Sequence, residues 1–279
     1  MPNHPIIQTL LPLVRGYKAS GLNKEVILNI VKEELQNHIL YALYSSPLTS
    51  EMIFYGGTSL RKIYGLNRLS EDLDFEIENE LSASTIEEVI LNYFKSISLG
   101  KVYSLKQENN VVQRVTFKFP ILFDLELSPL RDENIHVKVE MSKTVGKKLG
   151  NISKSAYSLS NLSMLIRHYD LETLMASKIV ACINRVERKK GKKIISFKGR
   201  DFYDLLWYMS KSIKPNEERL KSQLEMNTTE VFEKLDERVK SINSEDLFSE
   251  LSDYFIDTKF IRNWCDNFHS LYSQYRKQY

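Results

Sequence analysis

The sequence predicts an α/β (α+β) protein in which helices precede a mixed sheet and a helical domain follows it. In the first half, apolar residues alternate over short stretches typical of strands, whereas after about residue 160 they recur every three to four positions, as in helices. A segment rich in Ser, Lys and Gly, residues 143–163, separates the two patterns. We therefore expect a sheet-containing domain over residues 1–160 and a helical domain over residues 161–279.

The composition is that of a chain able to fold around a sizeable core. Of its 279 residues, 42% are hydrophobic and 27% charged, which allows two domains and argues against a largely disordered protein. The two cysteines, Cys182 and Cys265, lie far apart, which argues against a disulfide framework and a cysteine-ligated zinc site. Pro12 interrupts the apolar run at residues 6–14, and no other stretch approaches membrane-spanning length. We expect a cytoplasmic protein without a membrane segment.

The first long element is a predicted helix over residues 23–44, with Asn23 as its N-cap. Its apolar residues recur at helical spacing, so one face turns towards the core. His38 lies on this face, where a core histidine is more common than a metal ligand. The other histidines of the sequence lack neighbours typical of a metal site, so zinc is not indicated.

A glycine turn follows the next predicted strand, residues 53–55. The glycine pair that ends at Gly57 allows the backbone to approach a ligand closely. Thr58 or Ser59 is expected to cap the helix that follows, and Gly65 is expected to end it. Backbone amides at the start of a helix bind phosphate groups. Taken alone, however, such a turn more often only ends a strand.

Two aspartates in the following predicted strand, residues 72–75, share one face. Apolar residues alternate with Asp72 and Asp74, so the apolar side chains point to the core and both carboxylates point the other way. Like charges this close repel unless a cation lies between them, and Mg²⁺ or Mn²⁺ carrying a nucleoside triphosphate (NTP) suits such oxygen ligands. An exposed edge strand would show the same alternation. A phosphate-binding turn followed by paired carboxylates, however, favours nucleotidyl transfer.

The rest of the first domain is predicted as one helix and three strands. Ser84 and Thr85 resemble capping boxes for a helix that ends near residue 98. Strands follow at residues 102–105, 111–123 and 135–141. In the last of these, Glu140 lies on the polar face.

In the helical half, a lysine lies on the apolar face of a predicted helix. The apolar stripe runs through residues 171–186, and at 100° per residue Lys178 falls in its middle. An inward ammonium group needs an anionic partner or substrate, because burying it unpaired is costly. Either an ion pair with a core aspartate or a contact with substrate phosphates would satisfy it.

Acidic and basic residues gather around the start of the next predicted helix. Asp201 and Asp204 lie one turn apart on one face. The helix dipole and capping favour carboxylates in a first turn, which is a purely structural explanation. The preceding segment, residues 185–200, carries eight basic residues and one acidic residue. It predicts either a surface that binds polyanions such as RNA or a solvated loop.

Four segments resemble the AbiEii/AbiGii toxin family of nucleotidyltransferases, which includes the MenT toxins, within the polymerase-β-like superfamily. They read GGTSL at 56–60, RLSEDLDF at 68–75, LMASKI at 174–179 and KGRDFYDL at 198–205. The resemblance spans about residues 50–210 and rests on the combination of motifs. It implies a polymerase-β-like nucleotidyltransferase core with a mixed sheet.

The resemblance also implies roles for individual residues. The metal ligands for Mg²⁺ or Mn²⁺ would be Asp72, Asp74 and a third carboxylate from a later strand. Glu140 looks like this third ligand, with Asp124 and Glu126 as rivals.

Further roles concern the nucleotide and catalysis. Contacts with the NTP are expected from Gly57, Thr58, Ser59, Arg68, Ser70 and Arg200. Lys178 would neutralise phosphate charge, Asp201 would be a base or a substrate-positioning group, and Asp204 a further catalytic residue.

For the acceptor, the resemblance implies the 3′ end of tRNA. The chain would then be the toxin of a toxin–antitoxin or phage-defence system that blocks translation, with a cognate antitoxin encoded nearby. Two alternatives stay open: a nucleotidyltransferase that modifies a protein or a small molecule, and a nucleotide-binding regulator without turnover.

Overall fold

The computed structural model describes residues 4–78, 81–99, 101–108, 112–143, 150–159, 161–185, 188–190, 193–195 and 197–279. The chain divides into two compact units. The sheet unit comprises residues 1–65, 69–147 and 153–168, and the helical unit comprises residues 66–68, 148–152 and 169–279. The short segment 66–68 therefore belongs to the helical unit, although its chain neighbours on both sides belong to the sheet unit.

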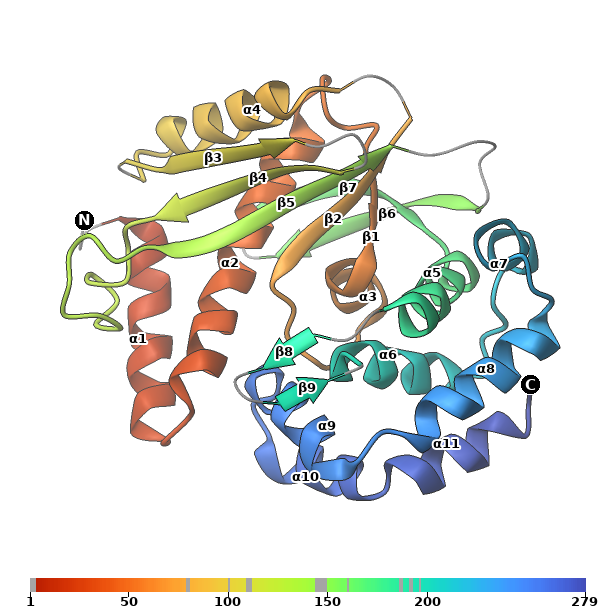
Figure 1. The fold of residues 1–279 in the computed structure, drawn as a ribbon. Coiled ribbons are helices and arrows are strands. Elements are labelled where there is room, and N and C mark those ends of the chain that lie inside the picture. Colours follow the sequence, from red (N-terminus) through yellow and green to blue (C-terminus); the bar gives the residue numbers. More distant parts are fainter. Residues whose placement is uncertain are drawn as a thin grey trace. The chain divides into compact units, whose positions relative to one another are not determined.

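The strands of the sheet unit form one mixed sheet (Figure 1). They are β1 Ile53–Tyr55, β2 Asp72–Ile77, β3 Tyr103–Glu108, β4 Val112–Phe119, β5 Ile135–Lys143, β6 Ile152–Leu159 and β7 Leu162–Tyr169. Their order across the sheet is β3-β4-β5-β2-β1-β7-β6. β2 pairs in parallel with β5 and antiparallel with β1, and β4 and β3 continue the sheet antiparallel from β5. This mixed α/β architecture confirms the predicted fold class.

Helices cover one face of this sheet. They include α2 Lys24–Ser45, which contacts β5, and α4 Ala83–Ser96, which contacts β3 and β4, while α1 Pro5–Ala19 packs on α2. The side chains that point to these helices from β2, β4 and β5 are buried: Leu73, Phe75, Val115, Phe117, Val137 and Val139. In β5 the buried residues alternate with exposed and half-exposed ones, as predicted. The polar residues of the sheet therefore gather on the other face.

Two helix caps test the predicted boundaries. The side chain of Asn23 accepts a hydrogen bond from the amide of Glu25, which confirms it as the N-cap of α2. The predicted cap of α4 is wrong. Ser82, rather than Ser84 or Thr85, occupies the N-cap position and accepts a hydrogen bond from the amide of Thr85. The helix therefore begins before the segment that resembled a capping box.

A connection was expected over residues 143–163, and this prediction is wrong because β6 lies within that stretch. The side chains of β6 are mostly exposed or half-exposed, since the strand forms an edge of the sheet. An edge strand of this kind shows no apolar alternation that a sequence would reveal. The sheet unit consequently extends to residue 168, past the predicted domain boundary near residue 160.

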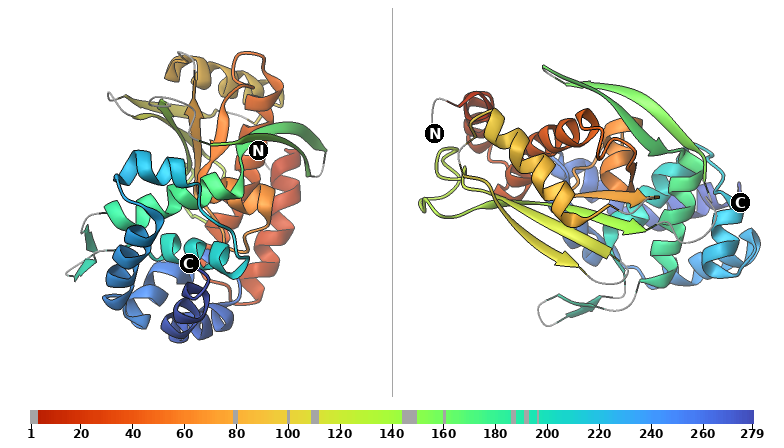
Figure 2. Two further views of the ribbon diagram at one scale, coloured as in Figure 1. Left: turned by 90° about the vertical axis from the view of Figure 1, so that its right-hand side faces the viewer. Right: turned by 90° about the horizontal axis from the view of Figure 1, so that it is seen from above.

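The helical unit contains helices and a small hairpin. The helices are α5 Leu171–Asn184, α6 Gly199–Ser210, α7 Glu217–Leu224, α8 Thr228–Lys240, α9 Ser244–Leu251, α10 Thr258–Asp266 and α11 Phe268–Arg276, with a 3-10 turn at Ser252–Tyr254. β8 Arg188–Lys190 and β9 Lys193–Ile195 form the hairpin, which protrudes from α5 and α6 (Figure 2). Within the described part of the chain, we find no helix with the length and apolarity that a membrane span requires.

Candidate active-site residues

The glycine turn lies directly beside one of the paired carboxylates. Gly56 has a φ of +79°, a conformation that L side chains rarely adopt. It follows Tyr55, which pairs with Asp74 across β1 and β2. A Cβ atom at Gly56 would overlap the Oδ2 atom of Asp74. Both the backbone conformation and the approach of the carboxylate therefore require glycine here.

The helix after the turn, α3 Gly56–Tyr64, begins earlier than predicted. Its N-cap position is Tyr55, so the prediction that Thr58 or Ser59 caps it is wrong. Both hydroxyl groups instead fasten the turn: Thr58 Oγ1 donates to the carbonyl of Asp72 (2.5 Å) and Ser59 Oγ donates to that of Phe54 (3.4 Å). Both residues are buried. A phosphate bound at this turn would therefore meet the backbone amides of the first helical turn.

The sheet places three acidic side chains on one face. Asp72 and Asp74 alternate with buried apolar residues in β2, as predicted. Glu140 in β5 pairs directly with Asp74 in the parallel register. Paired residues on neighbouring strands project to the same side. We call Asp72, Asp74 and Glu140 the sheet carboxylates.

The two rivals for the third carboxylate lie elsewhere. Asp124 and Glu126 belong to a turn after β4 rather than to a strand beside β2. Glu126 forms an exposed ion pair with Arg15 of α1 at 2.5 Å. The register thus favours Glu140 among the three, although its role as a metal ligand stays a prediction.

Cationic residues accompany the sheet carboxylates. Lys138 Nζ lies 3.7 Å from Asp72 Oδ1, and Arg114 Nε donates to Glu140 Oε1 at 2.7 Å. Carboxylate oxygens on one face suit a hard cation such as Mg²⁺ or Mn²⁺. Among the described residues, however, no three acidic, histidine or cysteine side chains are close enough to form a metal site. An ion would have to draw Asp72 away from Lys138 and Glu140 away from Arg114.

Three residues near the sheet carboxylates were missed by the sequence analysis. Glu76 continues the polar face of β2 and is buried. It pairs with Ser142 of the neighbouring strand β5. The hydroxyl group of Ser142 lies 3.3 Å from that of Tyr55. Burial, together with the charge of Asp74, raises the pKa of the Tyr55 phenol. The alternation of Asp72, Asp74 and Glu76 was the available signal for Glu76.

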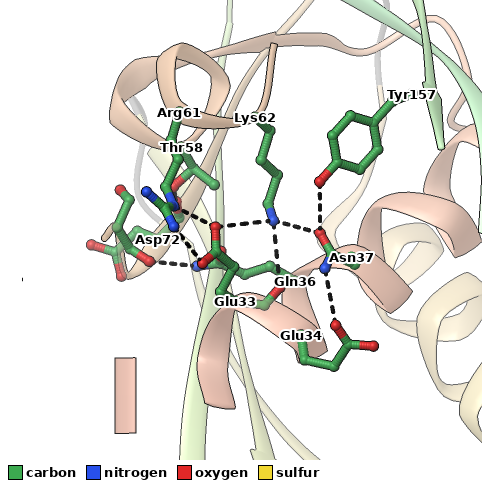
Figure 3. A network of polar contacts seen from close by, with 10 residues as sticks. Glu33, Glu34, Gln36, Asn37, Thr58, Arg61, Lys62, Asp72 and Tyr157 are labelled. Atoms are coloured by element: carbon green, nitrogen blue, oxygen red, sulfur yellow. Dashed lines mark hydrogen bonds and ion pairs between the residues drawn. The ribbon is translucent and has the colours of Figure 1, made fainter. Parts of the chain in front are cut away.

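A network of polar contacts fixes α3 and the start of β2 on α2 (Figure 3). Arg61 binds the carboxylate of Glu33 through two nitrogens, and Lys62 Nζ donates to Asn37 Oδ1 at 2.5 Å. Gln36 of α2 donates to the carbonyl of Ser70 at 2.9 Å, just before β2 begins. The predicted nucleotide contact Ser70 is itself buried. These bonds hold the segment that carries Asp72.

The helical unit contains a separate group of charged residues, which we call the buried ionic cluster. Arg68 donates two hydrogen bonds to Asp204, at 2.6 and 2.7 Å. Lys178 Nζ lies 3.0 Å from Asp201 and 2.9 Å from Asp204, and Arg185 lies 2.9 Å from Asp201. Lys178 therefore points inward, as predicted, and here its anionic partners are core aspartates.

The cluster shifts the proton affinities of its members. Burial alone would raise the pKa of Asp201, but Lys178 and Arg185 lower it to about 2. Burial opposes the shift at Asp204 as well, yet Arg68 and Lys178 lower the pKa of this carboxyl. The two aspartates in turn raise the pKa of Lys178 against the effect of burial. A carboxylate with a pKa near 2 is a weak proton acceptor at neutral pH, which favours a positioning role for Asp201 over a role as base.

The remaining predicted contacts with nucleotide or RNA are Arg200 and the basic segment at residues 185–200. The guanidinium carbon of Arg200 lies 4.2 Å from the centre of the Tyr254 ring, a cation–π arrangement. Of the predicted basic surface, the side chains of residues 186–196 lie outside the described residues, although the strands of the hairpin are described. Its role in RNA binding therefore stays a prediction.

We expect Gly56→Ala to remove nucleotidyl transfer, because its Cβ displaces Asp74. Gly65→Ala is the matched control, since Gly65 also has a positive φ (+76°) but no atom within 4 Å of an added Cβ. Both variants should lose about 1–2 kcal/mol of stability from backbone strain. Transfer assays at a temperature where both are folded should find activity only in Gly65→Ala. Equal activity in the two variants would contradict the assignment of Asp74.

We expect the stability of the wild-type chain to fall more steeply in acid than that of Asp201→Asn. The Asp201 carboxyl has a lower pKa in the folded chain than in the unfolded chain, so its ionised form stabilises the fold. This stabilisation is complete above about pH 4 and is lost as the pH falls towards 2. At neutral pH the effect amounts to about 2 kcal/mol for Asp201. Urea unfolding at pH 7, 4 and 2.5 measures it. Asp266→Asn, at a half-exposed carboxyl, should behave as wild type.

Comparison with known proteins identifies the family. Residues 38–265 match the family model described as "Nucleotidyl transferase AbiEii toxin, Type IV TA system". Two Helicobacter pylori crystal structures are similar over 90% of this chain, each with a TM-score of 0.48: JHP933, 20% identical over 94% of its length, and a candidate nucleotidyltransferase, 19% identical over 97%. No curated protein matches. Because the family model covers most of the sequence, the chain belongs to the AbiEii nucleotidyltransferase toxin family of type IV toxin–antitoxin systems.

Proposed function

We propose that this chain transfers a nucleoside monophosphate from an NTP to the 3′ end of tRNA. The observation that supports nucleotidyl transfer most directly is the shared face of Asp72, Asp74 and Glu140, with Gly56 packed against Asp74. A turn that presents backbone amides next to several carboxylates suits a metal-bound triphosphate. Family membership supports the same reaction class.

The sheet carboxylates are the proposed ligands of Mg²⁺ or Mn²⁺. When bound, the ion would supply positive charge that neutralises the triphosphate. The backbone amides of Gly57, Thr58 and Ser59 would bind phosphate oxygens, since their side chains are absent or turned into the protein. Ser70, held by Gln36, is a further proposed nucleotide contact.

Residues of the helical unit are proposed to act on the nucleotide phosphates. Lys178 would neutralise phosphate charge, and Arg200 would contact a phosphate through its guanidinium group. Arg68 and Asp204 bind each other, so we assign them the positioning of Lys178. Asp201, which also pairs with Lys178, would orient substrate groups as a hydrogen-bond acceptor.

In the reaction, an acceptor hydroxyl attacks the α-phosphorus of the NTP. The new oxygen–phosphorus bond forms as the bond to the oxygen that bridges the α- and β-phosphates breaks, and pyrophosphate leaves. The hydroxyl proton passes to solvent, because Asp201 is too weak a base at neutral pH. The chain contributes by holding phosphates and acceptor in line.

Modification of tRNA in the cytoplasm would block translation, which would inhibit growth as a toxin does, and would explain phage defence. A cognate antitoxin encoded nearby would relieve it. The same site allows a second candidate, transfer to a protein or small-molecule acceptor. A regulator without turnover is a third candidate, which the projection of three carboxylates from one face of the sheet disfavours.

Incubation with each labelled NTP, Mg²⁺ and either total RNA or total protein tests the proposal. We expect label in the tRNA fraction, and at its 3′ end after nuclease mapping. Label confined to protein would establish the second candidate instead. Tight NTP binding without label in any fraction would establish the regulator and overturn nucleotidyl transfer.

A further inference from the structure

The face of the sheet opposite α2 and α4 continues from the sheet carboxylates to the edge strand β3. In one row, Lys138 of β5 lies between Asp72 of β2 and Thr116 of β4, whose next partner is Leu105 of β3. In the neighbouring row, His136 pairs with Lys118, and Lys118 pairs with Tyr103. Side chains of paired residues project to the same side, so both rows form one surface. We call Tyr103, Leu105, Lys118, His136 and Lys138 the outer strip.

The outer strip combines exposed apolar groups with positive charge. Tyr103 and Leu105 are 52% and 48% exposed, and they lie two positions apart on the same face of β3. His136 and Lys138 are exposed and Lys118 is half-buried. Partial burial lowers the pKa of His136, and so do the charges of Lys118, Lys32 and Lys138. Lys118, on the neighbouring strand, and Lys138, two positions along β5, thus place positive charge beside His136.

The opposite side of β3 is built differently. There Lys106 lies 2.8 Å from Glu87 of α4, and Ser104 donates to Glu87 at 2.6 Å. The charge of Lys106 is therefore paired within the protein. Lys106 therefore lies on one face of β3 and the residues of the outer strip lie on the other.

We propose that the outer strip binds the single-stranded 3′ segment of an RNA acceptor. Nonspecific binding of single strands combines positive charge for the backbone with aromatic groups for the bases, and the strip offers both. Neighbouring strands lie about 4.8 Å apart, so the path from β3 to β2 is roughly 14 Å, a length suited to a short extended segment. The strip leads to the sheet carboxylates, and the inference therefore rests on the proposed function.

The test compares two variants of the full chain with wild type by the anisotropy of a labelled single-stranded oligoribonucleotide. Tyr103→Ala should weaken binding about 5-fold to 150-fold, the range expected for loss of one stacked base. Lys118→Gln should reduce the slope of log affinity against log salt by about 0.7, as for loss of one phosphate contact. Lys106→Gln, on the other face of β3, should change neither. Because Tyr103 is exposed, circular dichroism should find all variants folded.

The outcomes separate this inference from the proposed function. If wild type labels RNA but Tyr103→Ala and Lys118→Gln bind the oligoribonucleotide as tightly as wild type, the strip is not the RNA site while the function stands. If wild type labels only protein and binds no RNA, the proposed RNA acceptor is wrong, and the inference about the outer strip is wrong with it. Competition by polyglutamate as strong as by the oligoribonucleotide would assign the strip to an acidic peptide and overturn the proposal.

Discussion

Asp74→Ala and Asp72→Ala are each expected to abolish nucleotidyl transfer and growth inhibition while the chain stays folded. The two carboxylates lie on the polar face of β2, so their removal leaves the apolar side of the strand intact. Loss of a carboxylate also lowers the repulsion within the sheet carboxylates. The ion pair of Asp72 with Lys138 is half-exposed and contributes little to stability. Transfer rates at saturating Mg²⁺ and thermal unfolding measure the two effects.

Three further substitutions test which residue is the third metal ligand beside Asp72 and Asp74. Glu140→Ala should also abolish transfer, because Glu140 is the direct neighbour of Asp74. Asp124→Ala and Glu126→Ala are matched controls from the turn after β4 and should retain activity. Wild-type rates in Asp72→Ala or Asp74→Ala would remove the proposed metal site altogether. Activity in Glu140→Ala together with its loss in Asp124→Ala would reassign only the third ligand.

Lys178→Met is expected to destabilise the helical unit and to slow transfer by several powers of ten. The substitution leaves Asp201 and Asp204 buried with one cationic partner fewer, and breaking such a buried pair typically costs about 3–5 kcal/mol. Lower stability of the helical unit is one cause of slower transfer. If Lys178 neutralises phosphate charge, weaker NTP binding is a second cause. Urea unfolding measures the stability, and NTP binding measured on the folded variant isolates the second cause.

The exposed Lys240 of α8 provides the matched control, since Lys240→Met should alter neither stability nor transfer. A folded Lys178→Met protein with weak NTP binding would support the phosphate role. Lower stability combined with unchanged NTP binding and unchanged transfer at low temperature would make Lys178 a structural residue.

The features that could be predicted from the sequence depend on local patterns. The alternation in β2 placed Asp72 and Asp74 on one face, and helical periodicity placed Lys178 inside. Both patterns span only a few residues, so no knowledge of chain pairing was needed. The Gly65 helix end was predictable for the same reason.

Other features depend on which segments meet. The bond between Arg68 and Asp204 joins residues 136 positions apart, so no spacing rule reveals it. The pairing of Glu140 with Asp74 depends on the register of two parallel strands, which apolar alternation alone cannot fix. The roles of the Thr58 and Ser59 hydroxyls followed from helix α3 starting at Gly56, a boundary that local propensity places poorly.

The parallel pairing of β2 with β5 has a consequence for the cell that makes this protein. Asp72 and Asp74 leave the ribosome long before Glu140, and β2 lacks its parallel neighbour until β5 has been synthesised. Contacts between distant segments form late, because the intervening chain must first be closed into a loop. A nascent or prematurely terminated chain that ends before β5 therefore carries two of the three sheet carboxylates without the strand that aligns them. Nucleotidyl transfer would thus begin only after synthesis has passed β5.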